Sequence, residues 1–126
     1  MRTITVVAIG FLLILAFGIG AYAYVNSSAS QMAGQLKTAE DAIRAQKWEL
    51  AQGQLASVQQ NWDRAKSRWA VLLDHEEIDN IDISIKRLAE YVKSKGSALA
   101  LGEVSALRLL VEHISDKEAP NIKNIL

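Results

Sequence analysis

Apolar side chains dominate the N-terminal part of the chain. No charged residue occurs from Ile4 to Val25, a stretch longer than the roughly 20 residues that a helix needs to cross a bilayer core of about 30 Å. Arg2 precedes this run, and the next basic residue is Lys37. Because basic residues favour the cytoplasmic side, the pattern predicts a single-pass transmembrane helix in the cell membrane over residues 1–25, with the N-terminus cytoplasmic and the rest of the chain outside.

A cleaved signal peptide is the alternative interpretation of this segment. Ala21-Tyr22-Ala23 has the small-x-small spacing that signal peptidase recognises, and cleavage near Ala23 would give a secreted domain. The apolar run continues to Val25. Tyr22 and Tyr24 also suit the aromatic belt at a membrane surface. An uncleaved anchor is therefore the preferred interpretation.

Beyond Asn26 the apolar residues recur every three or four positions, which is the spacing of one helix face. The pattern predicts amphipathic helices over residues 28–45, 47–75, 77–94 and 97–117. Gly96 is expected to end the third of these in a left-handed conformation. Short connections make neighbouring helices antiparallel. We therefore predict an all-α fold with one N-terminal transmembrane helix, followed by a domain over residues 26–126 that is an antiparallel bundle of three to four helices.

An alternative arrangement of the same helices is a pair of stacked hairpins of the tetratricopeptide kind. No second copy of such a repeat aligns along the chain, which favours the bundle. After Pro120 the chain ends in a short tail, which we expect to dock on the body through Ile122, Ile125 and Leu126.

The second predicted helix carries the clearest pattern in the chain. Large residues recur at every seventh position, and each is followed three positions later by Ala51, Val58, Ala65 or Leu72. Such an a/d seam is typical of helices that pack by heptads. Together with the apolar positions of the third helix, it predicts a core that contains Trp48, Leu55, Trp62, Trp69, Leu72, Ile78, Ile81, Ile85 and Leu88.

Composition narrows the possible functions. The chain has 14 basic and 14 acidic residues and a formal net charge of zero, so it offers no basic balance for a nucleic-acid partner. It contains no cysteine, which excludes disulfide bonds, a cysteine zinc site and a thiol nucleophile.

One charged cluster offers candidate metal ligands. His75 and Asp79 lie four positions apart near the start of the third predicted helix, and Asp82 lies one turn further along. This spacing suits a divalent cation. The helix dipole also favours carboxylates in a first turn, and a solvated helix start is the preferred interpretation. Since no nucleophile–base pair and no phosphate-binding loop is recognisable, we predict no catalytic residue, no cofactor, no metal site and no enzymatic activity.

Three segments carry a family resemblance: Trp69-Ala-Val-Leu-Leu-Asp-His-Glu-Glu-Ile-Asp-Asn-Ile-Asp with the preceding Trp62, then Arg87-Leu-Ala-Glu-Tyr, and the terminal Asn124-Ile-Leu. They resemble an uncharacterised family of small, N-terminally membrane-anchored helical proteins of Gram-positive, often spore-forming bacteria, a domain of unknown function (DUF4363-like). The resemblance covers nearly the whole chain. It implies a membrane segment and a helical body, and it implies no activity. Because its most specific part is Trp69 to Asp82, it directs any family-specific role to His75, Glu76, Asp79 or Asp82.

Two classes of function fit these observations. A membrane-anchored structural or interaction protein would bind another protein or itself through its helix faces. An extracytoplasmic ligand- or metal-binding module, similar to four-helix sensor domains, would use the His75–Asp82 cluster or a cavity among the tryptophans. The lack of recognisable site chemistry favours the first class.

Overall fold

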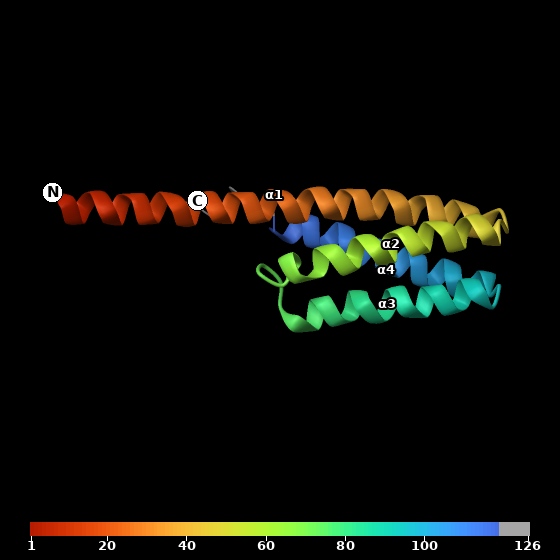
Figure 1. The fold of residues 1–126 in the computed structure, drawn as a ribbon. Coiled ribbons are helices and arrows are strands. Elements are labelled where there is room, and N and C mark those ends of the chain that lie inside the picture. The colour runs from red at the N-terminus through yellow and green to blue at the C-terminus, as the bar shows by residue number, and fades with distance from the viewer. Residues whose placement is uncertain (119–126) are drawn as a thin grey trace.

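The computed structural model of the chain describes residues 1–118, which form four helices (Figure 1). Their bounds are Arg2–Arg44 for α1, Trp48–Trp69 for α2, His75–Lys93 for α3 and Ser97–Glu118 for α4. The predicted all-α fold class is confirmed. The expected docking of Ile122, Ile125 and Leu126 lies outside the described residues.

α1 is a single uninterrupted helix that contains both the N-terminal apolar run and the first helix of the bundle. The predicted start of a separate helix at residue 28 is therefore wrong. Serine costs a helix interior only about 0.5 kcal/mol, and the Ser28 hydroxyl donates to the carbonyl of Val25 at 3.1 Å. Val25, Ala29 and Met32 are buried against the other helices, so packing keeps this polar stretch helical.

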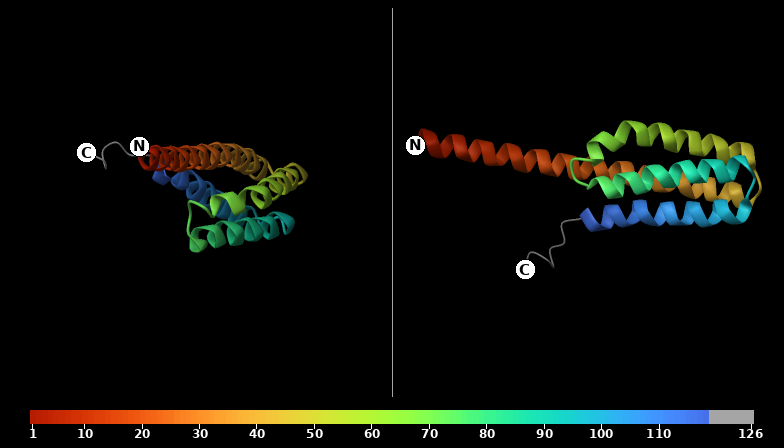
Figure 2. Two further views of the ribbon diagram at one scale, coloured as in Figure 1. Left: turned by 60° about the vertical axis from the view of Figure 1, so that its left-hand side comes forward. Right: turned by 90° about the horizontal axis from the view of Figure 1, so that it is seen from below.

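The α1–α2 and α3–α4 turns lie together at one end of the bundle and close in the same way (Figure 2). One residue in each turn is left-handed, Gln46 with φ of 56° and Lys95 with φ of 58°. The next N–H then bonds to a carbonyl of the preceding helix, at 2.8 Å in the first turn and 2.9 Å in the second, as in a Schellman motif. The left-handed conformation expected at Gly96 falls on Lys95 instead, because α3 ends at Lys93 and Gly96 is one position too late.

α2 ends at Trp69, whereas the sequence pattern predicted its end at residue 75. Asp74 caps α3, and its carboxylate accepts the N–H of Glu77 at 2.9 Å. A capping residue has extended backbone angles, and Asp74 has φ −77° and ψ 166°. α2 must therefore end before Asp74. The intervening turn buries Leu73 and leaves Leu72 half-buried.

The four helices pack around a square, in which α1 contacts α2 and α4, and α3 contacts the same two helices. α3 therefore lies diagonally opposite α1. The packing of α4 against α1 closes an antiparallel bundle rather than a row of stacked hairpins, in which each repeat contacts only its neighbours. Of the predicted core residues, Leu55, Trp62, Trp69, Ile81, Ile85 and Leu88 are buried, whereas Trp48, Leu72 and Ile78 are half-buried and pack against the core.

The apolar half of α1 extends beyond the bundle as a free helix (Figure 1). Its large apolar side chains are exposed from Ile4 to Ile19. Among the described helices, α1 alone is long and apolar enough to span a membrane. The bundle core already includes Val25, and Tyr24 packs against it, so the free helix and the bundle meet at these two residues.

Candidate functional site

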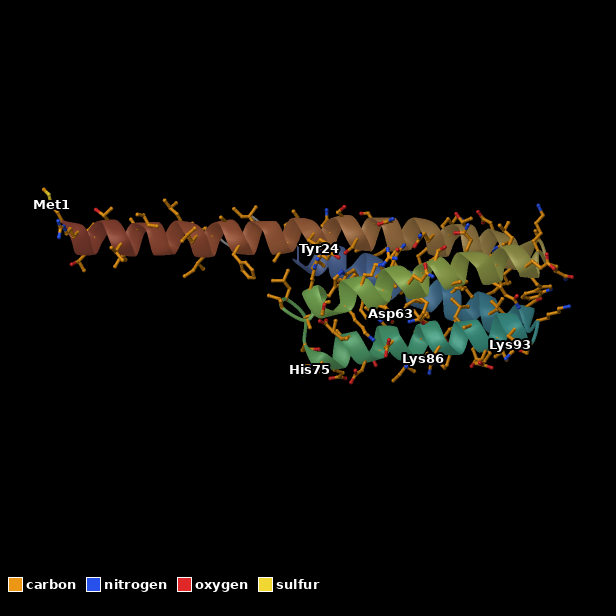
Figure 3. The ribbon with its side chains drawn as sticks, viewed as in Figure 1. Met1, Tyr24, Asp63, His75, Lys86 and Lys93 are labelled. Atoms are coloured by element: carbon orange, nitrogen blue, oxygen red, sulfur yellow. The ribbon has the colours of Figure 1, made fainter. Side chains whose placement is uncertain are left out.

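The acidic start of α3 does not gather the candidate metal ligands into one site. His75 and Asp79 are exposed, and Figure 3 places His75 at the first turn of α3. Asp82 turns toward α2, where its carboxylate accepts the indole N–H of Trp62 at 3.0 Å. Among the described residues, no group of three His, Asp or Glu side chains is arranged to hold a metal ion. Asp82 therefore acts as a contact between α2 and α3.

Two lysines complete the surroundings of Asp82. The Nζ of Lys86 lies 3.4 Å from one carboxylate oxygen, and the Nζ of Lys66 lies 3.8 Å from the other. Partial burial by itself raises the pKa of Asp82, but the hydrogen bonds from Trp62 and Lys86 and the charges of both lysines outweigh it, so the net effect is a lowered pKa. The carboxylate is therefore charged at neutral pH and stabilises the folded state there.

Each of the four neighbouring helix pairs has a polar contact of this kind. α1 and α2 are joined by Trp69, whose indole N–H donates to the Ser28 hydroxyl at 2.7 Å. α3 and α4 are joined by Glu103, which accepts from Ser84 at 2.7 Å and from Arg87 at 3.0 Å. Trp69 and Ser84 are buried, Glu103 is half-buried and Arg87 is exposed. Each contact favours one rotation of a helix against its neighbour. These contacts define the register of the bundle.

Glu40 makes the contact between α1 and α4, and sequence analysis did not single it out. Its side chain is almost fully buried, yet it accepts from Arg44 at 3.1 Å and from Arg108 at 2.9 Å. Arg108 also lies 3.5 Å from Glu112. A buried carboxylate needs such partners, because losing water without compensation costs several kcal/mol. The two main partners are far apart in the sequence, so helix periodicity gave no signal of their pairing.

The tryptophans of the heptad seam are structural. Trp62 and Trp69 are both fully buried, and their rings meet edge-to-face with centroids 5.2 Å apart. Beside Trp69, between α1 and α2, a cavity of about 180 Å³ opens to the surface. Its polar lining includes Ser27, Gln31, Asn61 and Arg64. Of the three tryptophans, Trp69 alone lines this cavity.

α4 has a second apolar face in addition to the one that it buries in the core. Its buried face carries Ala100, Val104, Leu107, Val111 and Ile114. The opposite side, which we call the α4 outer face, is exposed and consists of Leu99, Gly102, Ala106 and Leu109. A groove of about 500 Å³ adjoins its C-terminal part and is lined by Glu77, Asn80, Ile81, Ala106, Leu109, Leu110, His113 and Ile114.

The fold and these surfaces define the class of protein: a four-helix bundle whose first helix continues outward as an exposed apolar helix. Residues 19–125 match the family model described as a domain of unknown function, DUF4363, and the chain belongs to this family. The match confirms the resemblance that the sequence carries. Comparisons with curated proteins and with solved structures find no match. Inferences about function therefore rest on the surfaces of the bundle and on the apolar helix.

Proposed function

We propose that this chain is a membrane-anchored interaction protein. The apolar half of α1 spans the cell membrane once with the N-terminus in the cytoplasm, the bundle lies outside, and the α4 outer face binds a second copy of the chain. The observation that carries the proposal is that α4 is apolar on two opposite faces, although the bundle covers only one of them. Contiguous exposed apolar patches on a folded domain mark interaction sites.

The spacing of the α4 outer face supports a helical partner. Leu99, Gly102, Ala106 and Leu109 follow one another at steps of three and four positions, which is the a/d spacing of paired helices. A Cβ atom added at Gly102 would meet nothing within 4 Å, so the bundle itself does not require glycine there. Small residues at Gly102 and Ala106 would let a second helix approach closely.

The membrane anchor favours a second copy as the partner. α1 sets the direction of the membrane normal, and α4 packs antiparallel to it. Two copies in one membrane are therefore related by a twofold axis along the normal, which brings their α4 helices together in parallel. Each outer-face residue would then meet its own counterpart. The formal net charge of zero leaves no strong repulsion between copies.

The continuity of α1 favours an uncleaved membrane anchor over a secreted domain. Cleavage after Ala23 would cut the continuous helix α1 directly before Tyr24, whose ring lies under the Arg68 guanidinium at 4.8 Å. Cleavage there would break α1 at the point where the apolar helix joins the bundle. The proposal includes no catalytic activity and no cofactor.

Native mass spectrometry of the full chain, released from detergent micelles, tests the pairing. We expect a dimer for the wild type and a monomer for Leu109→Glu, because the substitution places a charge in the apolar interface. Ile83→Glu on α3 is the matched control, since Ile83 is 50% exposed and Leu109 is 61% exposed. A monomeric wild type, or equal loss of the dimer in both variants, contradicts the proposal.

A ligand-binding module is the second candidate function, and the cavity of about 180 Å³ beside Trp69 favours it. Its polar lining and its size suit a small polar molecule rather than a large cofactor. Thermal-shift measurements of the full chain against small anions, metabolites and divalent metals test this candidate. A flat response across the panel removes it, whereas a shift that Arg64→Ala abolishes would place the ligand in this cavity.

A further inference from the structure

The end of the bundle from which the free half of α1 leaves also carries the α2–α3 turn (Figures 1 and 2). A crevice of about 440 Å³ lies between α1 and the C-terminal end of α2 with the start of this turn. It is lined by Phe17, Gly20, Ala21, Tyr24, Ser67, Arg68 and Val71. The turn therefore lies beside residues of the uncharged run, not beyond the end of that run.

The length of α1 fixes the level of this turn relative to a bilayer. A core of about 30 Å takes about 20 helical residues, so with Ile4 at the inner boundary the outer boundary falls near Ala23. α1 has no break between the run and the bundle, and the bundle cannot move away from the bilayer independently. Val71, which shares a crevice with Gly20 and Ala21, then lies at the outer edge of the hydrocarbon.

The side chains at this corner have the chemistry of a lipid interface. Val71 is 58% exposed and would lose its contact with water at that level. Arg68 stacks over the ring of Tyr24, and Arg64 is exposed one turn earlier on α2. Aromatic rings lie at the boundary of the hydrocarbon, and arginine extends its charge toward the headgroups. The acidic first turn of α3, with Glu76 and Glu77, belongs to the helix diagonally opposite α1.

We propose that Arg64, Arg68 and Val71 form a membrane-contact corner, which rests on the outer leaflet and binds anionic lipid headgroups. This inference rests on the proposed membrane anchor. It adds a second attachment of the bundle, which fixes the tilt and rotation of the bundle and with them the direction in which the α4 outer face points.

Fluorescent probes at single cysteines test the corner, and the natural lack of cysteine makes the labelling specific. Val71→Cys, Leu50→Cys and Ile14→Cys in the full chain each receive an environment-sensitive label and are reconstituted into phosphatidylcholine vesicles with and without phosphatidylglycerol. Leu50 is the control, since it is 47% exposed and lies at the opposite end of the bundle. Ile14 reports the anchor. Quenchers are placed either near the headgroups or deep in the acyl chains.

The corner predicts that the Val71 probe shifts to the blue and loses fluorescence to the shallow quencher, and that the Leu50 probe does neither. Phosphatidylglycerol should increase the Val71 signal, and Arg68→Gln should remove that increase. Deep quenching at Ile14 with equal behaviour of Val71 and Leu50 overturns the corner and leaves the anchor intact. An Ile14 probe that no quencher reaches overturns the anchor and the corner together. A Val71 signal that is identical in both vesicles overturns the assignment of anionic headgroups.

Discussion

The two buried tryptophans give a matched pair of substitutions that tests whether Asp82 stabilises the fold. Trp62 and Trp69 are both fully buried on the same face of α2. The indole N–H of Trp62 donates to a charged carboxylate, whereas that of Trp69 donates to the neutral hydroxyl of Ser28. Replacing either tryptophan by phenylalanine shortens the aromatic side chain by one ring and removes the indole N–H donor. The two variants differ in the charge of the acceptor that loses its hydrogen bond.

The structure sets the expected magnitudes. A hydrogen bond to a charged group contributes about 1.5–3 kcal/mol and a neutral one about 1 kcal/mol. The Asp82 side chain keeps 25% of its exposure, so we take the lower end, about 1.5 kcal/mol, for the Trp62 bond. The smaller ring leaves an unfilled volume that costs about 1–2 kcal/mol in either variant. We therefore expect Trp62→Phe to destabilise the bundle by about 3 kcal/mol at neutral pH, and Trp69→Phe by about 2–3 kcal/mol.

The pH dependence separates the two variants. The pKa of Asp82 is lowered in the folded protein, so the stability that this group contributes is present above its unfolded pKa, about 3.9, and is lost as the pH falls through the folded value. As the pH falls through the lowered pKa of the folded state, the carboxyl group takes up a proton and its bond to Trp62 weakens. The cost of Trp62→Phe should therefore fall by about 1 kcal/mol in acid, while the cost of Trp69→Phe stays constant.

Guanidinium unfolding of the full chain in a nonionic detergent, followed by circular dichroism at neutral pH and at about pH 2.5, measures both costs. Asp82→Asn in each background supplies the double-mutant cycle. The reasoning is refuted if the cost of Trp62→Phe is the same at both pH values, or if Trp69→Phe shows the same loss in acid.

Two further pairs of substitutions test the α1–α4 ion pair and the packing of the α2–α3 turn. Glu40→Ala should destabilise the bundle by about 2 kcal/mol, because the half-buried guanidinium of Arg108 loses its main partner. The control Asp41→Ala removes an exposed ion pair and should change stability little. Thermal unfolding compares the two variants, and equal midpoints contradict a structural role for Glu40. Leu73→Ala should destabilise the bundle by about 2–3 kcal/mol and clearly more than Leu72→Ala, because Leu73 is the residue that the α2–α3 turn buries. A larger loss of stability for Leu72→Ala in chemical unfolding would show that Leu72 is the core residue, as the sequence pattern predicted.

Helix periodicity predicts most of the bundle, since it depends on short-range spacing that the structure preserves. The apolar positions of α2 that recur every three or four residues are buried from Ala51 to Trp69, where the helix ends. Capping of α3 by Asp74 is a local rule that overrides continuation of the pattern. The sequence suggested a break after Asn26 because serines and asparagine resemble a loop in composition. They remain helical because Val25, Ala29 and Met32 pack against other helices, and packing of that kind has no local signal.

Residues that act between helices were the hardest to predict. Glu40 and Arg108 meet only after α1 and α4 have packed, and neither spacing nor composition links them. Asp82 was considered with His75 and Asp79 as a candidate metal ligand because of their helical spacing, but its contact with Trp62 directs it toward α2. The α4 outer face could have been found from the sequence, because the uncharged steps from Leu99 to Leu109 run beside the buried series from Ala100 to Ile114.

Disulfide crosslinking in membranes tests the central claim most directly, because the chain has no cysteine of its own. Ala106→Cys places a thiol in the middle of the α4 outer face, and Ile83→Cys places one on the exposed surface of α3. Parallel pairing of α4 brings the two Ala106 positions together, so mild oxidation of intact membranes should convert the Ala106→Cys chain to a covalent dimer and leave the Ile83→Cys chain monomeric. Equal crosslinking of the two variants, or none at Ala106, would contradict pairing through α4.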